Sequence, residues 1–232
     1  NIARLNKLGT MVPSLTNFML SNAVTSGWLK KFLGFAPKRS IPLLYKTTLK
    51  AWIRHNKHKN TNGKSRKVYL FADEFTDFND TEIGIKTYQL LTHLGYQVEV
   101  PAHQQSGRAY ISKGLLRKAK HLANQNIELL ADLVNADTPL IGIEPSAILT
   151  FRDEYPDLAE QHNRVKAKKL AENALMVDEF LAAEMEKGNI KQNQFTLAGQ
   201  HIKLHGHCQQ KSVASTLPTK KMLSFPENYS VE

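Results

Sequence analysis

The densest group of side chains that could bind a metal lies in the stretch LHGHCQQK. It brings His205, His207 and Cys208 to the end of an apolar run that predicts a strand. Imidazole nitrogens and a thiolate bind zinc and other borderline metals. Strand alternation, however, would put both histidines on one face and Cys208 on the other, and no CxxC pair stands at zinc spacing. We therefore expect no closed zinc site. A nucleophilic Cys208 with a histidine base would need a geometry that sequence adjacency does not supply.

A second place for chemistry is the turn AHQQSGRAY. It lies between a predicted strand that ends at Pro101 and a helix predicted to run from Ile111 to about Asn135. Turns that follow strands carry ligands in many α/β proteins. Gly107 allows a close backbone approach, and Arg108 with the start of the next helix could bind an anion. A single Ser-Gly-Arg turn is not a phosphate-binding fingerprint, so it is weak support for a ligand.

Two further groups of polar residues follow predicted strands. In IEPSAILTF, Ser146 is expected to cap the next helix rather than act as a nucleophile, because no Gly-x-Ser-x-Gly elbow surrounds it. The strand VYLFA is followed by four carboxylates, namely Asp73, Glu74, Asp77 and Asp80. Their spacing is not that of an EF-hand, so capping and solvation are expected to explain them. No residue of the chain is predicted to be catalytic.

The bulk composition is that of an ordinary globular chain of 232 residues, 41% of them hydrophobic. The longest apolar stretch, Met11 to Leu29, is interrupted by polar residues and Pro13, so no integral membrane helix is expected. A single cysteine excludes an internal disulfide framework and fits a reducing compartment such as the cytoplasm. The first residue is Asn1 and no signal peptide follows, which suggests a piece of a longer protein.

The net charge of +10 raises the question of an anionic partner. Many of the cations crowd the polar stretch from Lys46 to Lys67. No aromatic stacking pattern or binding motif accompanies them, so we interpret the stretch as a solvated linker and expect no nucleic-acid partner.

This linker divides the predicted organisation into two domains. Residues 1–66 form a helical connector with the basic linker, in which apolar residues recur at helical spacing in short bursts between Pro13, Gly34, Pro37 and Pro42. Such short helices are expected to pack on another domain. Residues 67–232 form an α/β domain.

The α/β domain is predicted from alternating strands and helices. The segments VYLFA, YQVEVP and PLIGIEP read as strands, and RVKAKKLAENALMVDEFLAAEMEKG reads as a helix closed by Gly188. This alternation predicts a mostly parallel sheet with helices on both faces. The segment IKLHGHCQQKSVASTLPTKKMLSF then repeats the order of strand, turn and helix, and YSVE begins another strand. We therefore expect two pseudo-repeated halves, the second of them truncated.

Several of these motifs together resemble a known family. VYLFADEF, SGRAYISKGLLRKAK, PLIGIEPSAILTFRDEYPDL and LHGHCQQK are similar to the C-terminal cysteine-rich (CCG-type) domain of large FAD-linked oxidases. These are fused flavin and iron-sulfur enzymes related to D-lactate, glycolate and D-2-hydroxyglutarate dehydrogenases. The resemblance covers residues 68–232.

The resemblance implies cysteine pairs that ligate a cluster or metal in each half, and this chain departs from that pattern. Gln105 and Ser106 stand where Cys-Cys would precede Gly107-Arg108, and Ala147 stands where EPSC would end. Cys208 matches the family's cysteine, with His205 and His207 beside it. The first half is therefore expected to be a relic turn, and Cys208 is expected to bind metal only with ligands beyond Glu232.

The resemblance thus implies a fragment of a FAD-linked, iron-sulfur oxidoreductase acting on a 2-hydroxy acid. FAD and a 4Fe-4S cluster would belong to the parent protein, with no cofactor expected in this fragment. The implied partners are the FAD and ferredoxin-like domains of the same parent chain, and a peripheral membrane association of that parent is compatible with the family. The alternative is a metal-free packing or partner-docking domain without a redox role.

Overall fold

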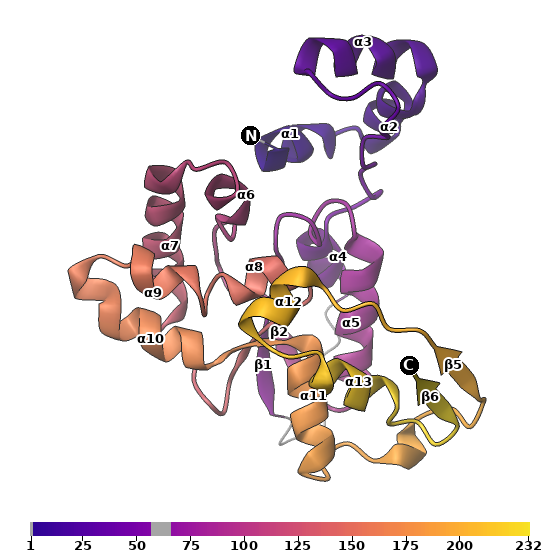
Figure 1. The fold of residues 1–232 in the computed structure, drawn as a ribbon, viewed down its shortest axis with the longest axis vertical. Helices are drawn as coiled ribbons and strands as arrows, with labels where there is room; N and C mark the ends of the chain where they lie inside the picture. Colours follow the sequence, from indigo (N-terminus) through magenta and orange to yellow (C-terminus); the bar gives the residue numbers. More distant parts are fainter. Residues whose placement is uncertain (1, 57–65) are drawn as a thin grey trace. The chain divides into compact units, whose positions relative to one another are not determined.

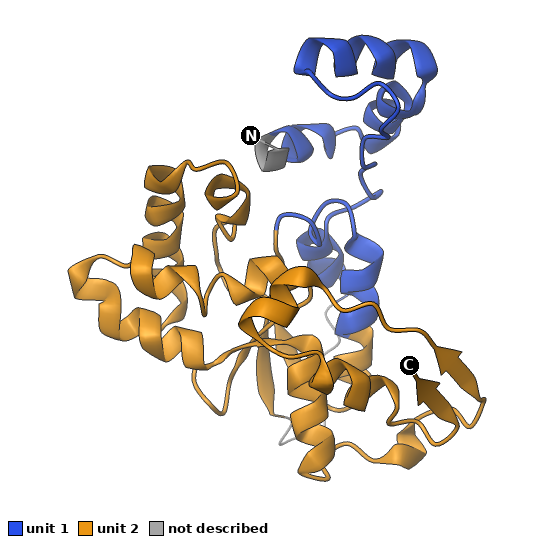
Figure 2. Ribbon diagram, viewed as in Figure 1, with its two compact units in different colours: residues 1–59, 74–88 blue, residues 60–73, 89–232 orange. Residues whose placement is uncertain are grey.

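The structure is a computed structural model that describes residues 2–56 and 66–232, with side chains from Leu5 onward. It divides into two compact units, coloured separately in Figure 2. Unit 1 comprises Asn1–Lys59 and Glu74–Tyr88, and unit 2 comprises Asn60–Asp73 and Gln89–Glu232. Residues 57–65 of the predicted basic linker lie outside the described residues, and Leu49–His55 form a helix with buried Leu49 and Ile53, so this part is not a solvated linker. The expected domain boundary at residue 66 stays a prediction.

Unit 1 is built of short helices, as the sequence predicted. They are α1 (Ile2–Gly9), α2 (Pro13–Ser21), α3 (Ala23–Leu33), α4 (Leu49–His55) and the first part of α5 (Thr81–His93). Pro13 occupies the first turn of α2, where its missing N–H costs nothing. The Asn22 side chain accepts hydrogen bonds from the first turn of α3, and Gly34 ends that helix with a φ of 72°. Local residue chemistry therefore sets these helix ends.

The core of unit 1 lies between α4 and the segment that leads into α5. Leu49, Ile53 and Tyr88 are buried there. The Asp77 carboxylate accepts a hydrogen bond of 2.9 Å from the Lys50 backbone N–H, at the start of α4. Helix α4 is therefore anchored by buried side chains and a hydrogen bond at its first turn. Helix α2, in contrast, has no buried residue.

Unit 2 contains the parallel sheet that the sequence predicted. Its strands are β1 (Lys67–Phe71), β2 (Gln97–Glu99), β3 (Leu140–Gly142) and β4 (Ala174–Met176), in the order β2-β1-β3-β4 (Figure 1). All three pairings are parallel. The chain moves outward from β1 to β2 and then back past β1 to β3. Alternate residues of β1 point to opposite faces and all of Val68–Phe71 are buried, so both faces of the sheet are covered.

Short helices connect and follow these strands. They are α6 (Arg108–Ile111), α7 (Leu116–Leu130), α8 (Pro145–Leu149), α9 (Glu154–Leu158), α10 (Arg164–Glu172) and α11 (Val177–Glu186), with the 3-10 turns η1 (Gln161–Asn163) and η2 (Gln192–Gln194). The single helix predicted from Ile111 to about Asn135 is wrong, because Gly114 adopts a φ of 68° and separates α6 from α7.

Strand β4 was not predicted at all. The sequence pattern predicts one helix from Arg164 to Gly188, but Ala174–Met176 pairs in parallel with Leu140–Gly142. Ala, Leu and Met all favour helices, so the local propensity of this segment predicts a helix where a strand forms. The pairing is decided by contact with a strand more than thirty residues earlier, which no local pattern reports. Gly188, with a φ of 72°, does follow the last helix of this segment as expected.

One hydrophobic cluster of unit 2 lies on one face of the sheet, and buried side chains such as Leu70 lie on the other. The cluster gathers buried residues from β1, α7, β3, α8, α9, α10 and β4, among them Phe71, Phe151 and Tyr155. The rings of Phe71 and Phe151 meet edge to face with centroids 4.9 Å apart. Helix α8 approaches β3 closely, since a Cβ added to Gly142 would lie 2.3 Å from the Ile148 Cβ.

The buried carboxylate of Glu184 links the amino ends of β1 and β2. Glu184 of α11 accepts hydrogen bonds from Arg66 (2.5 Å), Tyr96 (3.0 Å), Asn189 (2.9 Å) and Lys187 (3.2 Å). Burial by itself raises the pKa of Glu184, but these hydrogen bonds and the Arg66 charge outweigh it and lower the pKa. Glu184 therefore stays ionised and links β1, β2 and α11.

The C-terminal part of unit 2 repeats the order of strand, helix and strand. Strands β5 (Gln200–Ile202) and β6 (Tyr229–Val231) pair in parallel, with α12 (Cys208–Val213) and α13 (Leu217–Leu223) between them. This agrees with the predicted second half. The strand ends at Ile202, however, earlier than expected, so His205 and His207 do not lie on it and the strand-alternation argument does not apply to them.

Candidate functional site

The candidate site is the carboxyl edge of the sheet in unit 2. The chain leaves β2 at Glu99 and β3 at Gly142 along the same edge, because the two strands run parallel on either side of β1. Loops at such an edge carry the ligands of α/β proteins. Ser106 and Ala147, the positions where the resemblance implies cysteines, follow these two strands.

The turn after β2 is closed by a network of buried hydrogen bonds. The Asn126 side-chain oxygen accepts from the Gln104 N–H (2.7 Å), and its amide nitrogen donates to the Gln105 carbonyl (2.9 Å) and the Tyr155 hydroxyl (2.8 Å). That hydroxyl in turn donates to the Ser106 carbonyl over 3.0 Å. Ser106, Asn126 and Tyr155 are essentially inaccessible to solvent. The turn is thus held from inside by the protein's own side chains.

The next two residues set the start of α6. Gly107 adopts a φ of 82°, in the left-handed region that suits glycine. The Ser106 hydroxyl oxygen accepts a hydrogen bond of 3.1 Å from the Arg108 N–H. The Arg108 guanidinium forms an ion pair with Glu154 of α9. Burial raises the pKa of Glu154, and the Arg108 charge partly opposes that rise. The cation proposed for an anion site therefore has a partner within the chain.

The turn after β3 is capped by a different residue from the one expected. Glu144, not Ser146, is the N-cap of α8: its carboxylate accepts a hydrogen bond of 2.6 Å from the Ala147 N–H. Ser146 lies inside the helix and donates its hydroxyl to the other Glu144 oxygen over 2.6 Å. Pro145 occupies the first helical position, which leaves Glu144 in the capping position. The Ala147 methyl group points into the core and is fully buried.

The segment with Cys208 reaches this edge through α12, which packs against α8. His207 is the N-cap of α12, and its Nδ1 accepts a hydrogen bond of 3.2 Å from the Gln209 N–H. Its Nε2 lies 3.9 Å from a carboxylate oxygen of Glu144. Cys208 begins the helix and is exposed, as is His205. The two ring nitrogens of His207 therefore face Gln209 and Glu144.

These residues do not fit an iron-sulfur cluster. A cluster needs about four thiolates, and this edge offers a hydroxyl at Ser106, a methyl group at Ala147 and one thiol at Cys208. Within residues 2–56 and 66–232, no group of three or more His, Cys, Asp or Glu side chains is arranged to hold a metal ion. No redox step is therefore derived from this edge alone.

Sequence reasoning missed Asn126, Glu154 and Tyr155, which hold the turn. One signal could have indicated Asn126: it shares the core-facing side of α7 with Ala123 and Ile127, where an amide side chain needs a specific partner. Its three partners lie on β2's loop and on α9, so their identity required the fold.

The carboxylates after β1 are not solvated, contrary to expectation. Asp73, Glu74 and Asp77 are buried, and only Asp80 of the four is exposed. Burial raises the pKa of Asp77, and the hydrogen bond and charge of Lys50 oppose that rise. The expected capping role holds for Asp77, which bonds the first turn of α4.

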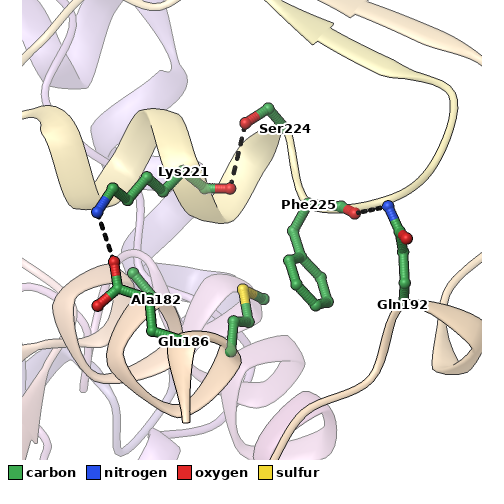
Figure 3. A pocket seen from close by; sticks show the side chains of 7 residues that line it. Ala182, Glu186, Gln192, Lys221, Ser224 and Phe225 are labelled. Carbon is green, nitrogen blue, oxygen red and sulfur yellow. Dashed lines mark hydrogen bonds and ion pairs between the residues drawn. The ribbon is translucent and has the colours of Figure 1, made fainter. Parts of the chain in front are cut away.

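Unit 2 also has an open cleft of about 350 Å³ among α11, α13 and η2 (Figure 3). Its walls combine Met185 and Phe225 with an ion pair between Lys221 and Glu186. The Gln192 amide closes one end by donating to the Phe225 carbonyl over 2.8 Å. None of the residues predicted from the sequence lines this cleft.

None of the helices in the described residues combines the length and the apolar character needed to cross a bilayer.

The chain is similar to curated D-2-hydroxyglutarate dehydrogenases. It is 24% identical over 216 residues to the proteins of Escherichia coli (strain K12) and Pantoea ananatis (strain AJ13355), which covers 90% and 89% of this chain. It is also 29% identical over 142 residues to lactate utilization protein A of Bacillus subtilis (strain 168), covering 60% of this chain and 58% of that protein. The chain spans only 20% of the length of the two dehydrogenases. No family model and no solved structure matches it.

Proposed function

We propose that this chain is a structural and electron-transfer module of a FAD-linked, iron-sulfur oxidoreductase that oxidises a 2-hydroxy acid. Two of its similar proteins carry the name D-2-hydroxyglutarate dehydrogenase and cover about nine-tenths of its length. The parallel sheet and the second strand-helix-strand unit agree with the order of motifs that suggested this family. The resemblance extends to the turns at the carboxyl edge, although not to their cysteines.

We propose further that the first half has lost its ligand site, and one observation carries this proposal. The turn of Gln105 and Ser106 is filled and closed by Asn126 and Tyr155, and Ala147 is buried in the core. A cluster would need open thiolates at these positions. Ser106 and Ala147 are instead buried, Ser106 in a hydrogen-bonded turn and Ala147 in the apolar core. This favours a turn that has a structural role and binds no metal.

The second half is the part that could still take part in redox chemistry. Cys208 is exposed beside His205 and His207, so ligands from another segment or domain can approach it. In the proposed whole enzyme, FAD would supply two-electron oxidation of the 2-hydroxy acid and iron-sulfur centres would supply one-electron transfer. This chain would contribute Cys208 as one ligand and the remaining ligands would come from outside it.

The competing proposal is a metal-free packing or partner-docking domain. It is favoured by the single cysteine of the chain and by the closed hydrogen-bond network of the first turn. In that case the flavin and iron-sulfur domains would work without any ligand from these residues.

The two proposals differ in what Cys208 does to iron content. Iron and acid-labile sulfide would be measured anaerobically, with absorbance spectra, on this chain and on the protein purified with its flavin and iron-sulfur domains. Each sample would be prepared as wild type, as Cys208→Ala and as the control Ser212→Ala, which changes an exposed side chain of the same helix.

We expect Cys208→Ala, but not Ser212→Ala, to lose iron in the sample that contains all domains. Equal iron in all three would overturn the ligand role of Cys208 and leave the docking domain. Substrate class is tested separately, by the bleaching of flavin absorbance when D-2-hydroxyglutarate or D-lactate is added. Bleaching by neither compound would contradict oxidation of these 2-hydroxy acids.

A further inference from the structure

The basic charge of this chain is strongly segregated. The first acidic residue is Asp73, whereas Lys and Arg recur from Arg4 onward. Cations of this region therefore have no carboxylate near them in the sequence. A one-signed segment of this length attracts an anionic partner.

Helix α3 turns its apolar side outward. Val24, Trp28 and Phe32 follow one another at intervals of four residues, so they form a single stripe. They are 67%, 74% and 87% exposed, respectively, while Ser26 on the other side is buried. A helix of a globular protein normally buries its apolar stripe and exposes its polar residues. This reversal indicates that the stripe meets a partner that is not part of unit 1.

The neighbouring helix continues the apolar surface. Helices α2 and α3 are in contact, and the Thr25 hydroxyl donates to the Met19 carbonyl over 2.7 Å. Leu15 and Phe18 of α2 are more than half exposed. Helices α2 and α3 thus both present bulky apolar side chains. Together these side chains form a continuous surface and are not the scattered single apolar residues that are normal on a protein surface.

Cations and a hollow accompany this surface. An open hollow of about 270 Å³ is lined by Val24, Gly27, Trp28 and Lys31. Among these lining residues, the Lys31 ammonium is the charged group and the others are apolar. Lys30 donates to the Pro37 carbonyl over 3.3 Å, which draws the following turn toward α3. That turn carries Lys38 and Arg39, both exposed.

We propose that α2 and α3 dock on an anionic phospholipid surface. Trp28 and Phe32 would enter the boundary between headgroups and acyl chains, and the cations of Lys31 and the following turn would meet lipid phosphates. Nucleic acid is a poorer match, because aliphatic side chains such as Val24 and Leu15 do not stack on bases. The proposal does not depend on the proposed oxidoreductase function.

The test is co-sedimentation of the whole chain with two kinds of vesicle. One contains phosphatidylcholine alone and the other also contains phosphatidylglycerol. We expect binding to the anionic vesicles only, weakened by high salt. Lys31→Gln with Lys38→Gln should lower the partition coefficient about 30-fold, since each cation near such a surface contributes about 1 kcal/mol. Trp28→Ser with Phe32→Ser should lower it at least tenfold, about 1.4 kcal/mol.

Helix α10 of unit 2 supplies matched controls. Val165 is 81% exposed, and Lys168 and Lys169 are exposed beside it. Lys168→Gln with Lys169→Gln removes the same charge as the lysine variant of unit 1, and Val165→Ser replaces an exposed apolar side chain by serine, as the Trp28 and Phe32 variants do. If these controls lower binding as much as the variants of unit 1, the docking surface is not α3 and the proposal fails. Binding to neither vesicle, or equally to both, also overturns it.

Fluorescence gives a second readout that does not depend on the yield of sedimentation. The chain has two tryptophans, so Trp52→Phe leaves Trp28 as the only emitter. Its emission should shift to the blue on anionic vesicles and be quenched by brominated acyl chains. An unchanged spectrum in the presence of vesicles contradicts the proposal. So does a concentration-dependent dimer that Trp28→Ser and Phe32→Ser abolish without any vesicle binding, because the stripe would then be covered by a second copy.

Discussion

The hydrogen bonds around Tyr155 provide the most direct test of the closed turn. Tyr155→Phe removes one oxygen atom and leaves the ring in place, packed against Phe151 with centroids 4.3 Å apart. Apolar burial is therefore nearly unchanged. The variant loses the bond from Asn126 and the bond to the Ser106 carbonyl.

The magnitude follows from the burial of these groups. Loss of a partner by a buried polar group costs about 1–3 kcal/mol, because water cannot replace the lost hydrogen bond. Two such bonds, with some relaxation of the turn, predict a loss of about 2–4 kcal/mol in the free energy of unfolding. Asn126→Ala should cost at least as much, since three hydrogen bonds depend on that amide.

The assay is urea unfolding followed by circular dichroism, for both single variants and the double variant. Residues that share one network should couple by about 1 kcal/mol in the double-mutant cycle. The matched control is Tyr229→Phe in β6, where the side chain is partly exposed and a change within about 0.5 kcal/mol is expected.

Two results would refute the reasoning. A loss below about 0.5 kcal/mol for Tyr155→Phe would mean that the hydroxyl does not hold the turn. Additive costs for Asn126→Ala and Tyr155→Phe would mean that the two side chains act separately. Either result would remove the observation that supports a vacated ligand turn.

Two further predictions concern the scaffold around this edge. Glu184→Ala should cost about 3–5 kcal/mol in urea unfolding, because it leaves Arg66 and Tyr96 without their buried acceptor. Because the pKa of Glu184 is lowered in the folded state, its carboxylate stabilises the fold above the ordinary pKa of 4.5, and this stabilisation is lost as pH falls through the folded-state pKa. Wild type should therefore lose more stability than Glu184→Gln on acidification. Parallel curves of stability against pH would contradict this. Gly142→Ala should cost about 3 kcal/mol or more in thermal unfolding, because its Cβ would meet Ile148. Gly27→Ala, which meets no atom within 4 Å, should instead leave stability equal or higher, and similar losses for both would show that close packing is not the cause.

Much of the fold could be predicted because its signals are local. Alternating apolar runs and helix periods predicted β1, β2, β3 and the second strand-helix-strand unit. Glycines with positive φ, such as Gly34 and Gly188, ended helices where expected. Such residues act through their own backbone geometry, so the sequence alone reports them.

Two failures share one physical cause, which is that partners distant in the chain made the decision. Strand β4 exists because β3 offers it a pairing edge, although its residues favour a helix. The sequence could state only that Asp73, Glu74 and Asp77 are charged, and the fold buried them.

For the candidate site, the sequence by itself determined which atoms are present. Ser106 and Ala147 offer no thiolate, and Cys208 is the one cysteine of the chain. Only the tertiary structure decided how those positions are used: Asn126 and Tyr155 close the first turn, and α12 brings His207 close to Glu144. Residue chemistry is a property of each side chain, whereas burial and hydrogen bonding are set by whichever distant segment the packed core places beside it.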